Sequence, residues 1–163
     1  MEIREAKSLS DYKLIEHLAN IIWREHYTPI IGEDQVHYML QKFQTAEVFE
    51  SQVASGMTYK ILWEEKTAIG YCAYEKRENI LFLSKIYVEK SFRGKGIGKV
   101  TVQHIVDQAK TLGCNKIELT VNKNNTNSIA VYLKMGFRNV AAVVQDIGNG
   151  FVMDDYRMAF SLS

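Results

Sequence analysis

The stretch that decides the fold follows an apolar run and reads Tyr87-Val88-Glu89-Lys90-Ser91-Phe92-Arg93-Gly94-Lys95-Gly96-Ile97-Gly98-Lys99. Residues 80–88 are β-branched and aromatic, as in a strand, and residues 97–112 have the pattern of a helix. Glycines between a strand and a helix let the backbone approach a ligand closely, because no Cβ stands in the way. The first helical turn adds N–H groups without helical partners and the positive end of the helix dipole. The stretch therefore predicts a cradle for a pyrophosphate group.

The spacing of the glycines separates this cradle from two other phosphate-binding loops. A dinucleotide fingerprint needs Gly-x-Gly-x-x-Gly, but here Gly94, Gly96 and Gly98 alternate and Lys99 follows. A Walker loop ends in Gly-Lys followed by Ser or Thr, whereas Val100 stands in that place. A glycine-rich turn without a ligand is the remaining alternative.

A second motif lies further along the chain and reads Asn125-x-x-Ser128-x-x-x-Tyr132-x-Lys134-x-Gly136-Phe137. Together with Arg93-x-x-Gly96-x-Gly98, it resembles the two conserved blocks of the GCN5-related N-acetyltransferases, in the right order. The resemblance covers residues 57–160 well, whereas the first fifty residues share only a helical pattern. It implies acetyl-CoA as co-substrate. It also implies a mixed, mostly antiparallel central sheet flanked by helices.

The same resemblance assigns the cofactor-binding residues. The main chain of Ile86, Tyr87 and Val88 is expected to pair with the pantetheine arm, and a backbone N–H near Val88 to polarise the thioester carbonyl. The pyrophosphate is expected on backbone N–H groups of the loop, with a positive side chain beside it. The residues involved there are Arg93, Gly94, Lys95, Gly96, Ile97, Gly98 and Lys99. Asn125 and Ser128 complete the expected cofactor set, and Asn125 can also cap the helix it begins.

Periodicity predicts a single α+β domain over residues 1–163. A short strand at 2–7 precedes a helix at 12–25, capped by Asp11 and broken by the segment 27–32 that contains Pro29. Helices follow at 33–43 and after Thr45, where a short helix stops before Gly56. The remaining expected elements are strands at 58–63, 68–74 and 80–88, a helix at 97–112 closed by Gly113, a strand at 116–121, a helix at 125–135 and a hairpin of 137–146 with 151–160.

Composition excludes several classes of protein. A net charge of +1 leaves no global basic field, so no nucleic-acid partner is expected. No apolar run approaches the roughly 18 residues of a membrane span, and the N-terminus has no signal-peptide core, so a cytoplasmic protein is expected. A homodimer is the commonest soluble assembly and stays possible here.

The cysteines and histidines do not suggest a metal site. Cys72 and Cys114 lie far apart, and neither has the spacing of a metal ligand. Both stand in strand-like contexts and are expected to pack in the core rather than to carry an acyl group.

Acetyl transfer to an amine needs a proton donor for the leaving thiolate and a base for the amine. The resemblance places Tyr132 at the thioester sulfur, where its phenol, protonated at neutral pH, is the expected general acid. A core tyrosine is the alternative. Many relatives carry a glutamate on the strand before the loop, but residues 81–88 contain no carboxylate. Glu118 on the adjacent strand is one candidate for the base, Asp154 and Asp155 on the last hairpin are others, and a base that acts through ordered water is an equal alternative.

The acceptor is expected beside the turn between the first two helices. Aromatic and acidic side chains gather there, a combination that suits a substrate bearing an amine; they are Trp23, Glu25, His26, Tyr27, Pro29, Glu33 and Asp34. These residues could equally pack the helical corner. The function predicted is direct acetyl transfer from acetyl-CoA to a primary amine on a small molecule or peptide, in a ternary complex. A non-catalytic acyl-CoA-binding regulatory module is the alternative.

Overall fold

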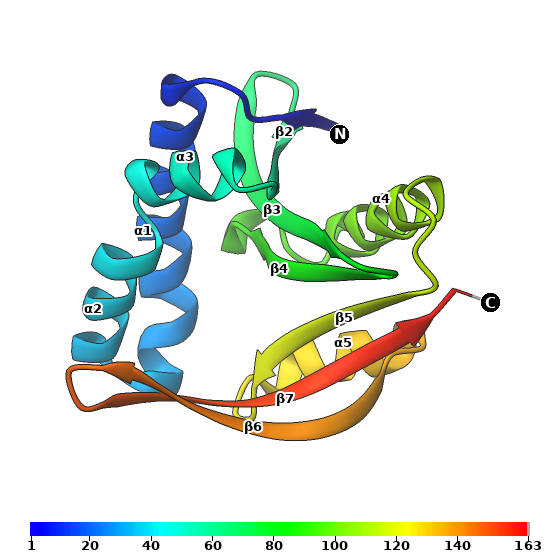
Figure 1. Ribbon diagram of the computed structural model, residues 1–163. Coiled ribbons are helices and arrows are strands. Elements are labelled where there is room, and N and C mark those ends of the chain that lie inside the picture. Colours follow the sequence, from blue (N-terminus) through cyan, green and yellow to red (C-terminus); the bar gives the residue numbers. More distant parts are fainter. Residues whose placement is uncertain (163) are drawn as a thin grey trace. The chain divides into compact units, whose positions relative to one another are not determined.

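The computed structural model describes residues 1–162 as an α+β fold, which confirms the fold class predicted from the sequence (Figure 1). The elements in chain order are β1 (Glu2–Glu5), α1 (Leu9–Ile31), α2 (Glu33–Phe43), α3 (Ala46–Ala54), β2 (Thr58–Glu64), β3 (Thr67–Arg77), β4 (Ile80–Val88), the 3-10 helix η1 (Lys90–Phe92), α4 (Ile97–Thr111), β5 (Lys116–Asn122), α5 (Thr126–Met135), β6 (Arg138–Gly148) and β7 (Phe151–Ser161). Within residues 1–162, no helix combines the length and apolar character needed to span a bilayer.

Seven strands form one sheet in the order β1-β2-β3-β4-β5-β7-β6. The β1–β2, β2–β3, β5–β7 and β6–β7 pairs are antiparallel. β4 and β5 are parallel, and their register runs only from Ile80 opposite Lys116 to Phe82 opposite Glu118. The chain divides into two compact units, the first made of residues 1–75 with 85–103 and the second of residues 76–84 with 104 onward.

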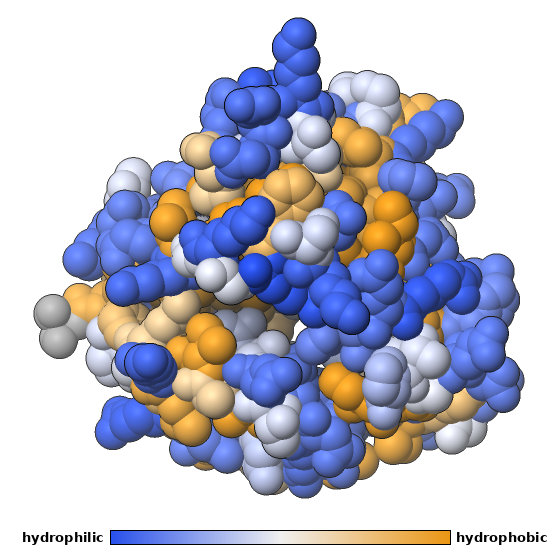
Figure 2. Space-filling view, turned by 180° about the vertical axis from the view of Figure 1, so that it is seen from behind, coloured by the Kyte–Doolittle hydropathy of each residue, from blue (hydrophilic) through white to orange (hydrophobic). Residues whose placement is uncertain are grey.

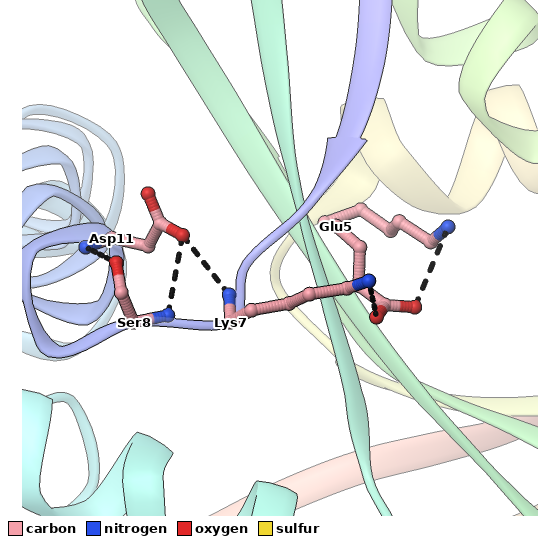
Figure 3. A network of polar contacts seen from close by, with 5 residues as sticks. Glu5, Lys7, Ser8 and Asp11 are labelled. Carbon is pink, nitrogen blue, oxygen red and sulfur yellow. Dashed lines mark hydrogen bonds and ion pairs between the residues drawn. The ribbon is translucent and has the colours of Figure 1, made fainter.

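The first unit begins with β1 and a capping box that starts α1. Asp11 N–H donates to Ser8 Oγ at 3.3 Å, and the backbone N–H groups of Lys7 and Ser8 donate to Asp11 Oδ2 at 3.0 and 3.3 Å (Figure 3). Ser8, not Asp11, is thus the N-cap, and the prediction placed the helix start three residues too late. The Ser-x-x-Asp spacing satisfies N–H groups on both sides of the helix start.

The predicted break of α1 at residues 27–32 is also wrong. The helix continues through Pro29 to Ile31 and ends at Gly32, whose φ of 87° no helix can accommodate. Pro29 lies in the last turn, so its missing N–H removes one helical hydrogen bond without opening a long stretch of helix. Gly32 N–H donates to Thr28 O at 3.0 Å and closes this end.

A small core ties the glycine-rich stretch to the sheet of the first unit. Leu62 of β2, Ile69 of β3 and Ile97 of α4 are buried together, and Val88 and Phe92 pack against them. Gly70 lets β3 and β4 approach, because a Cβ there would lie 2.3 Å from Tyr87 O and 3.1 Å from Val88 Cα. The end of β4 is therefore held by a contact that only glycine allows.

The second unit combines the β5–β7–β6 part of the sheet with α5, which Figure 1 shows on one face of these strands. Phe137 and Phe160 pack at 5.3 Å between ring centroids, beside Gly136, the left-handed C-cap of α5. β6 and β7 turn through Asn149-Gly150, with φ values of 54° and 77°, as the sequence predicted.

Figure 2 shows the face of the molecule that is turned away from the viewer in Figure 1. Small apolar areas on this face are separated by hydrophilic side chains.

Replacing Gly70 by alanine is expected to destabilise the protein by about 1–3 kcal/mol. The added methyl group would collide with Tyr87 O and Val88 Cα, which can move only if the β4 backbone moves with them. Urea denaturation measures the change in the free energy of unfolding. Gly98→Ala is the matched control, since no heavy atom lies within 4 Å of its Cβ position. Equal stability of the Gly70→Ala variant and the wild type would show that β3 and β4 do not need this close approach.

Candidate active site

The glycine-rich loop of the first unit has an open backbone. Gly94 and Gly96 both have φ of 78°, and a Cβ at either position would meet no heavy atom within 4 Å. Val100 N–H donates to Gly96 O at 3.0 Å and starts the hydrogen-bond ladder of α4. The N–H groups of the first helical turn, which precede this bond, lack helical acceptors, as at any helix start. A pocket of about 420 Å³, lined in part by Phe92, Lys95 and Gly96, lies beside the loop.

The end of β4 presents its backbone in a definite direction. Glu89 N–H donates to Ile69 O of β3 at 2.8 Å. Because successive residues of a strand alternate their hydrogen-bonding edge, the N–H and C=O of Val88 and of Ile86 point away from β3. Arg93 Nε donates to Val88 O at 2.9 Å. The outward edge of Ile86–Val88 is thus fixed at one end by the predicted loop arginine.

An aromatic cluster joins α1 to one face of β4 within the first unit. Ring centroids lie 5.5 Å apart for Trp23 and Tyr87, 4.6 Å for Trp23 and Tyr27, and 5.3 Å for Tyr71 and Tyr87. His26 packs edge-on against Tyr27 at 4.7 Å. Of the residues predicted around the acceptor, the structure thus joins these aromatic ones to β4, whereas it leaves Glu25, Pro29, Glu33 and Asp34 exposed.

Lys85 is a buried charge on the same face of β4, and the sequence analysis did not single it out. Its side chain is 7% exposed, and its ammonium donates to Tyr59 Oη and, at 3.3 Å, to Gln52 Oε1. Tyr59 Oη in turn donates to Gln52 Oε1 at 2.5 Å, and the Phe49 ring lies 5.3 Å from Lys85 Nζ. Burial lowers the pKa of Lys85 to about 8. Its inward-facing position in the alternation Leu81, Leu83, Lys85 was the available sequence signal.

The second unit carries the predicted proton donor on α5. Tyr132 is half-buried, and its ring centroid lies 5.6 Å from that of Phe137. Asn125 occupies the N-cap position of α5 with its side chain buried, but it makes no side-chain capping hydrogen bond, so its predicted cap role is wrong. Its φ of −83° and ψ of 65° depart from the extended backbone that capping side chains usually accompany. Ser128 is half-buried one turn along the helix.

Two predicted base candidates of the second unit have different surroundings. Glu118 on β5 lies 3.7 Å from Lys116 Nζ, and its side chain is 14% exposed. Asp155 on β7 is 8% exposed and pairs in register with Asn122. Burial, with a smaller contribution from the neighbouring charge of Asp154, raises the pKa of Asp155 to about 6. Asp154 itself is exposed and ion-paired to Lys123 at 2.8 Å.

Both cysteines are buried, as the sequence predicted. Burial raises the pKa of Cys72 to about 12, so its thiol stays protonated at neutral pH. A protonated, inaccessible thiol is a poor nucleophile toward a thioester.

Three comparisons identify related proteins. The model of the acetyltransferase (GNAT) family matches residues 15–137. The peptidyl-lysine N-acetyltransferase YjaB of Salmonella typhimurium is 26% identical over 156 residues, which cover 93% of both chains. The PaiA N-acetyltransferase of Thermoplasma acidophilum, crystallised with coenzyme A, superposes with a TM-score of 0.80 over 99% of both chains at 20% identity, which establishes the likeness of the fold.

Some relatives are much longer than this chain. UPF0157 protein YqkA of Bacillus subtilis is 27% identical over 116 residues, and these cover 71% of this chain but only 32% of YqkA. The chain therefore spans about a third of the length of that relative.

Asp155→Asn is expected to stabilise the protein at pH 7–8 by about 1–2 kcal/mol, with little effect below pH 4. Between its ordinary pKa of 3.8 and about 6, the native carboxyl keeps a proton that the unfolded chain releases, so the free energy of unfolding falls as pH rises through this window. An amide cannot ionise and escapes this loss. Urea denaturation at several pH values measures it, and Asp154→Asn, at an exposed site, should show a smaller change. Parallel pH profiles for wild type and Asp155→Asn would contradict the burial argument.

Proposed function

Because this chain belongs to the acetyltransferase (GNAT) family, we propose that it transfers an acetyl group from acetyl-CoA directly to a primary amine. Acetyl-CoA is the co-substrate in this family, and the chain is an acyltransferase. The observation that carries the proposal is the open loop at Gly94 and Gly96, placed between the outward edge of β4 and the first turn of α4.

The loop offers two kinds of contact to the cofactor. Backbone N–H groups from Gly94 to Lys99 would bind the pyrophosphate at the positive end of the α4 dipole. Arg93 and Lys95 add positive charge, although the Nε of Arg93 already donates to Val88 O. Asn125 and Ser128 are assigned to the cofactor from the family motif.

The outward edge of β4 would hold the reactive end of acetyl-CoA. The backbone of Ile86 can pair with the amide groups of the pantetheine arm as a neighbouring strand would. The N–H of Val88, which points away from β3, can donate to the thioester carbonyl and stabilise the charge that develops when the amine attacks. Arg93 supports this geometry because it engages the carbonyl of the same residue.

The roles in proton transfer are assigned from the family motif and from the chemistry of the side chains. Tyr132 would donate a proton to the departing thiolate. Glu118 and Asp155 are candidates for accepting the proton of the amine. Burial raises the pKa of Asp155 from 3.8 to about 6, nearer to neutral pH, which suits a base. Neither cysteine is used, because a buried thiol such as that of Cys72 cannot form an acyl-enzyme readily.

Gly96→Val is expected to abolish or strongly weaken binding of coenzyme A, because a branched side chain would fill the space above the loop backbone. Isothermal titration calorimetry with coenzyme A measures the affinity. Gly113→Val is the matched control: its φ of 75° and open surroundings reproduce the backbone strain at the other end of α4. Unchanged affinity in a folded Gly96→Val protein would remove the loop from the cofactor site.

Tyr132→Phe is expected to lower kcat by about 10²-fold while leaving the affinity for acetyl-CoA unchanged, because only the hydroxyl group is lost. Thiol release from acetyl-CoA across a panel of primary amines provides the assay, and it also separates an enzyme from a binding module. Tyr38→Phe on α2 controls for loss of a tyrosine hydroxyl elsewhere. Wild-type turnover in the Tyr132→Phe enzyme, with chemistry rate-limiting, would exclude Tyr132 as general acid.

A further inference from the structure

The buried cluster around Lys85 has more hydrogen-bond donors than acceptors. A lysine ammonium has three N–H groups and no acceptor. Two of them are donated to Tyr59 Oη and Gln52 Oε1, and the Tyr59 hydroxyl donates its own proton to the same Gln52 oxygen. One N–H of Lys85 is therefore available to a further acceptor.

A second buried donor on this face of the sheet, the indole N–H of Trp23, is at best weakly satisfied. The indole N–H of Trp23 is buried and has no well-formed hydrogen bond within residues 1–162, although the Tyr71 hydroxyl lies beside it. Tyr71 Oη donates its proton to Gln44 Oε1 at 3.0 Å. A buried donor without a well-formed acceptor is rare in folded proteins and marks a place where a water molecule, an ion or a ligand group can bind.

The charge of Lys85 has no counter-ion in the chain. Among residues 1–162, no carboxylate oxygen lies within 4.0 Å of its Nζ. The groups around it are the Tyr59 hydroxyl from β2, the Gln52 amide and Phe49 ring from α3, and the aromatic rings beyond them. A buried cation is stabilised only when an anion or several hydrogen bonds replace its lost water.

We propose that the acceptor amine also carries a carboxylate, which binds the ammonium of Lys85 on the face of β4 that Trp23 and Tyr87 share. This inference rests on the proposed acetyl transfer and adds the class of substrate, an amino acid in the broad sense. The carboxylate would supply the missing acceptor and the missing counter-charge together, through charge-assisted hydrogen bonds.

The strand sets the approximate length of this acceptor. Lys85 precedes Val88 by three residues, or roughly 10 Å along a strand at about 3.3 Å per residue. The carboxylate and the amine would therefore be separated by several bonds. A polyamine fits poorly, because its second ammonium group would approach a buried positive charge with no anion beside it.

The binding preference should depend on pH. Burial lowers the pKa of Lys85 to about 8. Above this pH the Lys85 side chain is neutral and no longer attracts the carboxylate of the substrate. Tyr59, which accepts a hydrogen bond from Lys85, and Tyr71 on β3 both have pKa values raised by burial, so neither ionises in this range. Preference for an acid over its amide should be largest below pH 8 and decline above it.

The test compares acids with their own carboxamides in binding experiments without turnover. Isothermal titration calorimetry on the enzyme loaded with coenzyme A measures affinities for glycine, β-alanine, 4-aminobutyrate and 6-aminohexanoate, and for the corresponding amides. We expect at least one of the longer acids to bind about 10-fold or more tightly than its amide at pH 7. Lys85→Met should remove this preference; the variant should fold, because an apolar side chain of similar length replaces a buried charge.

Lys60→Met is the matched control, since Lys60 lies next to Tyr59 on β2 but its ammonium lies 4.0 Å from Glu5 Oε1. It should keep the preference for the acid. The proposal is overturned if no acid binds more tightly than its amide, or if the preference survives in Lys85→Met. Acetyl transfer is assayed separately: an enzyme that acetylates amines without this preference refutes only the substrate class, and one that binds the acids but transfers nothing refutes the proposed function.

Discussion

The close approach of β3 and β4 at Gly70 is the constraint on which the site depends. The backbone of Tyr87 and Val88 in β4 lies against Gly70 of β3, where there is no side chain. Val88 can then pack on Leu62, Ile69 and Ile97. The chain can then leave the sheet through η1 and enter α4 with Gly94 and Gly96 in the left-handed region. The loop is thus positioned by apolar packing beneath it, and its upper surface stays open.

Two buried ionisable groups show where the fold gives up stability. Lys85 in the first unit and Asp155 in the second are both held in surroundings that disfavour their charged forms. A methionine or an asparagine would fill the same space at lower cost. Buried groups whose pKa values are shifted in this way mark candidates for functional sites, one in each unit.

The sequence predicted the elements whose ends are marked by specific residues. Thr45 accepts from Val48 N–H at 3.3 Å and begins α3, and Gly113, with φ of 75°, closes α4. The sequence-based prediction was wrong at both ends of α1. Pro29 suggested that the helix ends there, but a proline in the last turn removes only one hydrogen bond. At the other end, Ser8 is the N-cap and Asp11 completes the capping box. The family motif supplied the loop and Tyr132. Lys85 was missed because a lysine inside a strand pattern is usually read as a solvated charge, and its burial depends on α3, far away in the sequence.

The central claim is that the acetyl group passes from acetyl-CoA to an amine while both are bound. Mass spectrometry of the intact protein after incubation with acetyl-CoA alone, and then with a primary amine added, tests it most directly. The account predicts an unmodified protein at both stages, with coenzyme A and acetylated amine appearing in equal amounts only after the amine is added. An acetyl group on Cys72 or Cys114 that is passed on to the added amine would contradict it and establish covalent catalysis.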